Sequence, residues 1–284
     1  MSFAPLAPTI HVPPTEVAPD TFVIHQVQPA LGAPLFVYIN SMVIRGDEPI
    51  VVDTGTPANR TQWQEDVFAL VDPEDVRWIF LSHDDVDHSG NLDEVMSACV
   101  NATLVCSWAT VERHTNCFNF PLDRLLWVTD GGSFDAGDRT LEAIRPPVYD
   151  SPTTRGLFDT RTGVYWAVDS FATPLPDPAA GISDLDPEFW TDGLTMFAHG
   201  AVSPWLAIAN PQRYGIIVDR VAALGASLIA SCHSPVLEGA FIDQALAHFR
   251  RLPGLDAPPL PDQAMLDEFL AAMPVHGAAP QASA

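Results

Sequence analysis

The sequence contains no lysine, and all 13 of its basic side chains are arginine. A chain without lysine cannot form a lysine Schiff base and cannot supply the lysine of a phosphate-binding P-loop. Its 36 acidic residues give a formal net charge of −23. Because nucleic acid and anionic membrane surfaces attract basic proteins, we expect no nucleic-acid partner and no membrane partner.

Cysteines and long apolar runs are also scarce. The chain has four cysteines without CxxC spacing, which predicts reduced thiols in the cytoplasm: Cys99, Cys106, Cys117 and Cys232. No run approaches the roughly 20 apolar residues of a membrane span. The first residues lack the positively charged segment of a signal peptide. We therefore expect a soluble, cytoplasmic protein.

The 284 residues are 47% apolar, enough for one large domain with its own core. Proline-rich residues 1–20 predict an irregular N-terminal arm, residues 21–273 a single domain, and residues 274–284 a disordered tail. Apolar runs predict strands at 35–44, 49–53, 77–82, 102–107, 163–170 and 227–231. Helical spacing predicts helices at 60–71, 91–99, 110–117, 205–224 and 241–252. Two groups of strands with helices between and after them predict an α/β sandwich.

The segment "LSHDDVDHSG" at residues 81–90 places His83, Asp85, Asp87 and His88 directly behind a buried strand. On a helix Asp85 would point away from His83 and Asp87, so we expect a loop in which all four side chains converge. Carboxylates crowded in a semi-enclosed site need cations to neutralise them. Metal binding is the favoured interpretation, and a solvated charged loop is the alternative.

Three further candidates stand at the ends of predicted strands or turns. Asp169 follows "VYWAV", His233 follows "SLIAS", and Asp150 stands in "PPVYDSPTT". Each alone has an ordinary explanation: a strand-end aspartate, a hydrogen-bonded core histidine and a turn cap. Together they repeat one arrangement, strand followed by a metal-type side chain, by which α/β folds build sites. We place Cys232 in the core, since adjacent strand residues point to opposite faces.

"HDDVDH" resembles the HxHxDH signature of the metallo-β-lactamase fold, with Asp85 in place of the second histidine. It is more specifically similar to the HxExDH form of flavodiiron proteins and of stand-alone oxygen-binding diiron proteins. The resemblance extends through "NATLVCS", "GGSFDAGDRTLEAI" and "GASLIASCHSPVL", and covers residues 35–252. It implies an αββα sandwich of the metallo-β-lactamase type.

The resemblance also implies a ligand set for two metal ions. His83 and Asp85 would bind one ion, Asp87, His88 and His233 the other, and Asp169 would bridge them. Asp150 stands 19 residues before Asp169, where the family has a histidine. Asp150 is then either a ligand or the reason that its ion is held incompletely.

Three imidazoles and four carboxylates favour iron or manganese over zinc, and of these we expect iron. We therefore expect a non-haem diiron protein that binds or reduces dioxygen, with or without oxidation of a small substrate. Too few residues follow His233 for a flavin domain, so we expect no flavin of its own and an external electron donor. The resemblance implies a homodimer.

Two alternatives stay open: a metallo-hydrolase for a lactone, thioester or phosphoester, and a non-catalytic oxygen or redox sensor. For the sensor, the loop 173–187 and the aromatic stretch 186–197 would form a lid or docking surface, unless they are an ordinary packed insertion.

Overall fold

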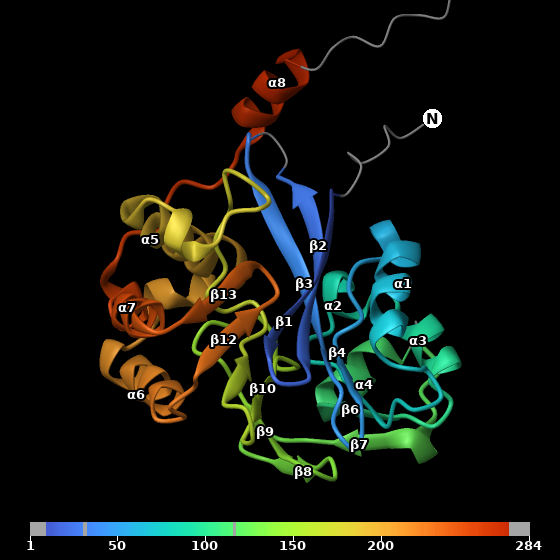
Figure 1. The fold of residues 1–284 in the computed structure, drawn as a ribbon. Helices are drawn as coiled ribbons and strands as arrows, with labels where there is room; N and C mark the ends of the chain where they lie inside the picture. Colours follow the sequence, from blue (N-terminus) through green and yellow to red (C-terminus); the bar gives the residue numbers. More distant parts are fainter. Residues whose placement is uncertain (1–9, 31–32, 116–117, 273–284) are drawn as a thin grey trace, which may run out of the picture.

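The computed structural model describes residues 10–30, 33–115 and 118–272, with two β-sheets packed face to face (Figure 1). Seven strands form the first sheet in sequence order: β1 (Ile10–Ala18), β2 (Thr21–Pro29), β3 (Phe36–Ile44), β4 (Ile50–Val52), β5 (Trp78–Phe80), β6 (Thr103–Cys106) and β7 (Leu125–Trp127). The second sheet has the order β13-β12-β11-β10-β9-β8. Its strands are β8 (Ser133–Asp135), β9 (Thr140–Ile144), β10 (Gly156–Asp159), β11 (Val164–Trp166), β12 (Leu228–Ser231) and β13 (Ser234–Glu238).

Helices cover the outer face of each sheet (Figure 1). The first sheet is covered by α1 (Arg60–Leu70), α3 (Leu92–Ala98) and α4 (Trp108–His114). The second is covered by α5 (Pro187–Met196), α6 (Pro211–Ala222) and α7 (Ala240–Phe249). The short α2 (Val86–Ser89) lies near the seam between the sheets, and α8 (Gln263–Ala272) extends from the body. This layering confirms the predicted α/β class, an αββα sandwich.

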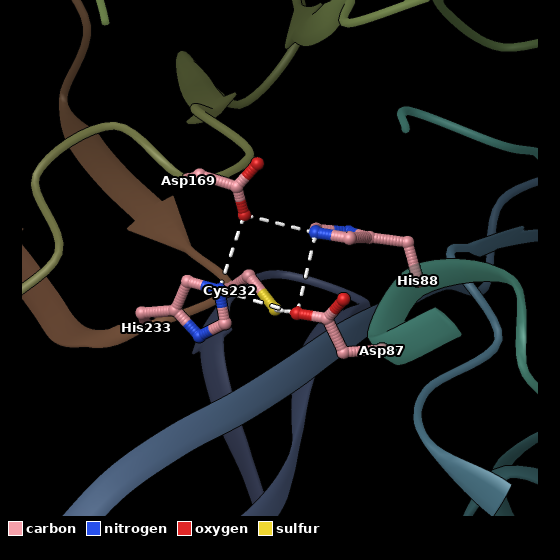
Figure 2. A group of neighbouring side chains, drawn as sticks. All are labelled: Asp87, His88, Asp169, Cys232 and His233. Carbon is pink, nitrogen blue, oxygen red and sulfur yellow. Dashed lines mark hydrogen bonds and ion pairs between the residues drawn. The ribbon is translucent and has the colours of Figure 1, made fainter. Parts of the chain in front are cut away.

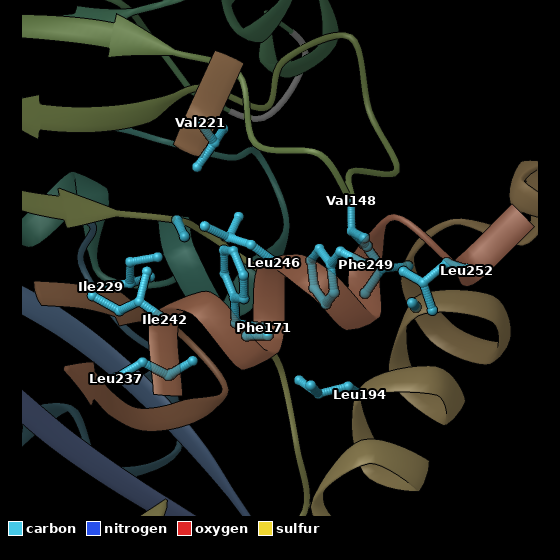
Figure 3. Close-up of a cluster of buried hydrophobic side chains, with 14 of the residues drawn as sticks. Val148, Phe171, Leu194, Val221, Ile229, Leu237, Ile242, Leu246, Phe249 and Leu252 are labelled. Carbon is cyan, nitrogen blue, oxygen red and sulfur yellow. The ribbon is translucent and has the colours of Figure 1, made fainter. Parts of the chain in front are cut away.

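Three apolar layers hold the sandwich together. Trp63 of α1 packs against the first sheet, and Met42 and Trp166 lie between the two sheets. The third layer joins the second sheet to its helices (Figure 3). There the rings of Phe171 and Phe249 stack with centroids 4.5 Å apart. Because both faces of β4, β5 and β11 are covered, these short strands are apolar throughout rather than alternating.

Parallel pairing determines where the functional side chains meet. β4, β5, β6 and β7 pair in parallel, and so do β11 and β12 of the other sheet. The carboxyl ends of parallel strands lie at the same edge of a sheet, so the segments after β4, β5, β11 and β12 can converge. In each of these segments the first candidate side chain lies within three residues of the strand end. The candidate site lies at this edge.

Three sequence predictions of local structure are wrong. The loop predicted for residues 81–90 contains the short helix α2, which carries Asp87 and His88. The irregular arm predicted over residues 1–20 contains β1, which pairs with β2 as an edge strand. Its register shifts between Val12 and Thr15, where Pro13 and Pro14 stand, and edge strands with bulges tolerate proline. The helix predicted over 205–224 begins only at Pro211, because Asn210 accepts a hydrogen bond from the Arg213 N–H and proline favours the first helical position. The predicted tail at 274–284 lies outside the described residues.

The described cysteines agree with the prediction of reduced thiols. Cys99, Cys106 and Cys232 are buried and form no disulfide among the described residues, whereas Cys117 lies outside them. Burial raises the pKa of Cys99 to about 11 and that of Cys106 to about 12. These two thiols therefore stay protonated at neutral pH. Among the described residues, no helix combines the length and the apolar character that a membrane crossing requires.

Candidate metal centre

All seven residues predicted from the sequence as ligands lie at one edge of the sandwich. Their donor atoms fall into two neighbouring groups, within each of which the atoms lie no more than 4.8 Å apart. The first group also contains a residue that the sequence reasoning assigned to the core: Asp87, His88, Asp169, Cys232 and His233 (Figure 2). The second group consists of His83, Asp85 and Asp150. Sequence separations are large, since Asp87 and Cys232 are 145 residues apart.

The first group forms a closed ring of alternating oxygen and nitrogen atoms (Figure 2). Asp169 Oδ1 lies 2.9 Å from His88 Nε2 and 3.2 Å from His233 Nε2. Asp87 Oδ2 completes the ring, 3.2 Å from His233 Nε2 and 3.7 Å from His88 Nε2. Two donors that share one ion at about 2.1 Å lie about 3 Å apart when adjacent and about 4.2 Å apart when opposite. The ring therefore fits one divalent ion.

The second group is more exposed and richer in oxygen. His83 Nε2 contacts Asp150 Oδ1, and His83 Nδ1 accepts a hydrogen bond from the Asp85 N–H at 2.9 Å. The side chain of Asp85 is 57% exposed and that of Asp150 is 29% exposed, whereas His83 is buried. One imidazole and two carboxylates that reach solvent suit a hard ion with water among its ligands.

Asp169 lies between the two groups. Its Oδ1 faces His88 and His233, and its Oδ2 lies 3.9 Å from His83 Nε2. One carboxylate thus presents one oxygen to each group. The bridging role that the resemblance implied for Asp169 is a proposal that this geometry supports.

The backbone around Asp169 is strained. Val168 and Phe171 have φ of 57° and 66°, values in the left-handed region that a β-branched residue such as valine rarely adopts. Both side chains are fully buried, and Phe171 stacks on Phe249, so packing holds the turn in place. Strained backbone of this kind is concentrated at functional sites.

Asp53 orients His88 from behind. It directly follows β4, is fully buried, and has a φ of 59°. Its Oδ2 accepts hydrogen bonds from His88 Nδ1 at 2.9 Å, from the Ser82 hydroxyl at 2.5 Å and from the Trp166 indole N–H at 3.0 Å, and its Oδ1 accepts one from the Ser82 N–H at 2.7 Å. A carboxylate bonded to the other nitrogen of a metal-binding histidine fixes its tautomer and ring orientation. The sequence did signal this residue: Asp53 follows "PIVV" as Asp169 follows its own strand.

Asp84 anchors the loop that carries His83 and Asp85. Its buried carboxylate accepts a hydrogen bond from the Thr153 hydroxyl at 2.7 Å and is paired with Arg113. Burial alone would raise the pKa of Asp84, but the hydrogen bonds from Thr153 and Arg113 and the charge on His83 lower it. Asp84 therefore stays ionised and ties this loop to the segment around Asp150.

The electrostatics of the first group favour a cation. Burial would raise the pKa of Asp87 and Asp169, yet the neighbouring imidazoles hold the pKa of both carboxyls well below the usual value. Burial would likewise lower the pKa of His88 and His233, and the surrounding acidic groups raise it well above the usual value. Anionic oxygens that stabilise a buried positive charge in this way also stabilise a divalent ion.

A cavity of about 160 Å³ opens over both groups. Besides the donor residues, Phe197, Ala201 and Val202 line it, all from the π-helical segment Phe197–Val202. No motif in the sequence marks this segment. Ligand pockets for larger organic molecules usually measure about 300–1,000 Å³. The cavity suits a molecule of a few atoms.

Replacing Asp53 by asparagine should weaken metal binding without removing any donor. The asparagine side chain has one oxygen and one NH2 group, so it cannot accept all the hydrogen bonds that Asp53 accepts from Ser82, His88 and Trp166. His88 would then lose its fixed orientation. We expect an affinity loss of about 10–100-fold, the range for partners of metal-binding histidines. Competition with a fluorescent chelator measures it. The matched control is Asp159→Asn, another buried aspartate, which pairs with Arg139 away from the cluster. An equal loss in both variants would contradict the role of Asp53.

Comparisons with known proteins identify the family to which the sequence is similar. The family model described as "Metallo-beta-lactamase superfamily" matches residues 35–178. The chain is 25% identical over 198 residues to the anaerobic nitric oxide reductase flavorubredoxin of Pectobacterium atrosepticum, covering 69% of this chain and 38% of that protein. The chain spans about a third of the length of the curated relatives it matches.

Solved structures show the same fold. Rubredoxin oxygen:oxidoreductase from Desulfovibrio gigas superposes with a TM-score of 0.70 at 13% identity, covering 85% of this chain and 61% of that one. The flavodiiron protein of Giardia intestinalis superposes with a TM-score of 0.71 at 17% identity, covering 86% of this chain and 60% of that one. The sandwich described above is therefore of the type that those structures share.

Proposed function

The chain belongs to the metallo-beta-lactamase superfamily, and from that premise we propose that it is a non-haem diiron protein that reduces dioxygen or nitric oxide. The observation that carries the proposal is the pair of adjacent donor groups joined by Asp169, in which oxygen donors outnumber nitrogen donors. Such a set favours iron or manganese over zinc. Relatives whose names include nitric oxide reductase and oxygen:oxidoreductase support the reaction class.

In this proposal Asp87, His88 and His233 hold one ion, His83, Asp85 and Asp150 hold the other, and Asp169 contacts both. Iron ions held there would supply the electrons with which a diatomic substrate is reduced. The cavity beside them admits a molecule of a few atoms, and Phe197, Ala201 and Val202 form the apolar part of a wall that is otherwise made of the carboxylates and imidazoles.

Sustained reduction needs more electrons than two ferrous ions hold. We propose that a separate donor protein supplies them, as the words flavorubredoxin and rubredoxin in the names of two relatives suggest. We also propose that the protein acts as a homodimer.

The test uses protein purified without oxygen from an iron-supplied host and freed of loose iron by gel filtration. We expect about two iron ions per chain and rapid uptake of dioxygen in a sealed oxygen electrode, in proportion to the bound iron. A zinc-loaded sample is the control and should consume no dioxygen. Protein that holds no iron after filtration, or iron-loaded protein that consumes no more dioxygen than the zinc form, would reject the proposal.

The two alternatives give different results in the same samples. A metallo-hydrolase would cleave lactones, thioesters or phosphoesters with zinc bound. A sensor would take up oxygen without product. Within the lid or docking surface proposed for the sensor, Trp190 and Leu194 of α5 pack in the buried cluster shown in part in Figure 3, whereas Phe197 lines the cavity.

A further inference from the structure

Cys232 lies in the wall of the first donor group, contrary to the sequence prediction that it only fills the core. Its Sγ is 3.9 Å from Asp87 Oδ2, to which the thiol donates a hydrogen bond, and belongs to the set of donor atoms no more than 4.8 Å apart. The prediction assumed a continuous strand, in which Cys232 and His233 would face opposite ways. Both residues instead lie in the turn between β12 and β13, and Figure 2 shows the two side chains on the same side, facing Asp87.

The turn holds Cys232 firmly in this orientation. Its N–H donates to the Val168 carbonyl at 2.7 Å, and its carbonyl accepts from the Asn40 N–H at 2.8 Å. The residue is fully buried, so water does not compete for the sulfur. Val168 precedes Asp169, and the same backbone contact therefore fixes the thiol relative to the carboxylate that lies between the two groups.

The surroundings separate Cys232 from an ordinary buried thiol. Free cysteine often behaves as a small apolar residue, as Cys106 does inside the first sheet. Cys232 has apolar neighbours on one side, but on the other it faces two carboxylates and two imidazoles. Two donors on one ion, at about 2.1 Å for oxygen and about 2.3 Å for sulfur, lie about 3.1 Å apart at a right angle and farther apart at wider angles. The observed 3.9 Å is within that range.

We propose that Cys232 is a fifth ligand of the ion held by Asp87, His88, Asp169 and His233. The inference rests on the proposed metal centre and deepens it. On binding, the S–H bond breaks, a metal–sulfur bond forms, and the proton leaves to solvent or buffer. The two ions would then differ in kind, because the group of His83, Asp85 and Asp150 offers only nitrogen and oxygen. A thiolate ligand makes the first site softer and tighter than the second.

Cobalt(II) distinguishes sulfur from oxygen and nitrogen ligands by its absorption spectrum, because thiolate ligation adds an intense sulfur-to-cobalt band in the near ultraviolet. We expect the full chain, loaded with cobalt(II) without oxygen, to show this band. Cys232→Ser and Cys232→Ala should lose it while still binding cobalt, with an affinity lower by about 10-fold or more. Cys106→Ala is the matched control, a buried thiol outside the donor groups, and should keep the band.

Each outcome decides the question. A wild-type protein that binds cobalt without the band, or a Cys232→Ser variant that keeps it, overturns ligation by Cys232 and leaves the metal centre standing. A wild-type protein that binds no cobalt overturns the metal centre and the thiolate ligand together. Circular dichroism of both Cys232 variants verifies the fold, and the serine variant retains a hydrogen-bond donor towards Asp87, which separates ligation from hydrogen bonding.

Discussion

Replacing Asp169 by alanine should abolish stable binding of both metal ions and, with it, the uptake of dioxygen. Asp169 is the residue that presents oxygens to both donor groups, at 2.9 Å from His88, 3.2 Å from His233 and 3.9 Å from His83. Removing an outer partner of a metal ligand costs about 10–100-fold in affinity. Removing a carboxylate that contacts both ions should lower the affinity for the two ions by more than about 100-fold. Elemental analysis after gel filtration and the oxygen electrode measure the two losses.

Asp85→Ala provides a graded comparison, because Asp85 belongs to the second group alone and its side chain is 57% exposed. We expect that variant to keep one ion per chain and to weaken only the other. Asp169→Glu, which restores the carboxylate, should recover part of the metal content. If Asp169→Ala bound two ions as tightly as the wild type, the bridging role would be wrong even though the donors lie together.

Replacing Trp166 by alanine should produce the largest loss of stability. Trp166 lies in β11 at the middle of the second sheet, is fully buried between the two sheets, and donates its indole N–H to Asp53. Large-to-small changes at such tryptophans cost about 3–5 kcal/mol. The same change also removes one hydrogen bond from the carboxylate that orients His88. Urea unfolding of the metal-free protein, followed by circular dichroism, measures the shift in midpoint.

Two variants separate the contributions. Trp166→Phe keeps one aromatic ring and loses the indole N–H, which donates to Asp53 and lies 3.4 Å from Ser82 Oγ. We expect a smaller cost, about 1.5–3 kcal/mol for a bond to a charged group. Trp127→Ala removes a tryptophan that is 53% exposed on β7 and should cost less than about 1 kcal/mol. An unfolding midpoint of Trp166→Ala no lower than that of Trp127→Ala would show that the space between the sheets tolerates the cavity.

The sequence was sufficient to find the donors because chemistry and fold agree there. A carboxylate or an imidazole follows the end of a buried strand within three residues at His83, Asp169 and His233, and the structure brings all three to one edge. Because these strands pair in parallel, the residues that follow them lie at the same edge of the sheets. Asp150 was harder to assign because it stands in a proline-flanked loop, yet its carboxylate contacts His83. Its role as a ligand remains a proposal.

What the sequence did not reveal depends on contacts between distant segments. The side-chain direction of Cys232 follows from a turn, and strand alternation does not apply in a turn. The proline-rich β1 is a strand because β2 provides a partner for it, and composition alone favoured an arm. The cavity wall at Phe197 comes from a π-helical segment that has no motif. In each of these cases the local structure depends on contacts with segments that are distant in the sequence.

If iron binds at the proposed centre, the span of chain between the donor groups would link iron supply to protein lifetime. His88 and Asp169 are 81 residues apart, and Asp87 and Cys232 are 145 apart. A cation held between them acts as a crosslink that closes long loops, and a covalent crosslink over about 100 residues stabilises by about 4–5 kcal/mol in the chain-entropy account. A ligand that binds only the folded chain also stabilises it by mass action. With iron as the proposed ion, iron-starved cells would degrade this chain faster, and its abundance would follow the iron supply.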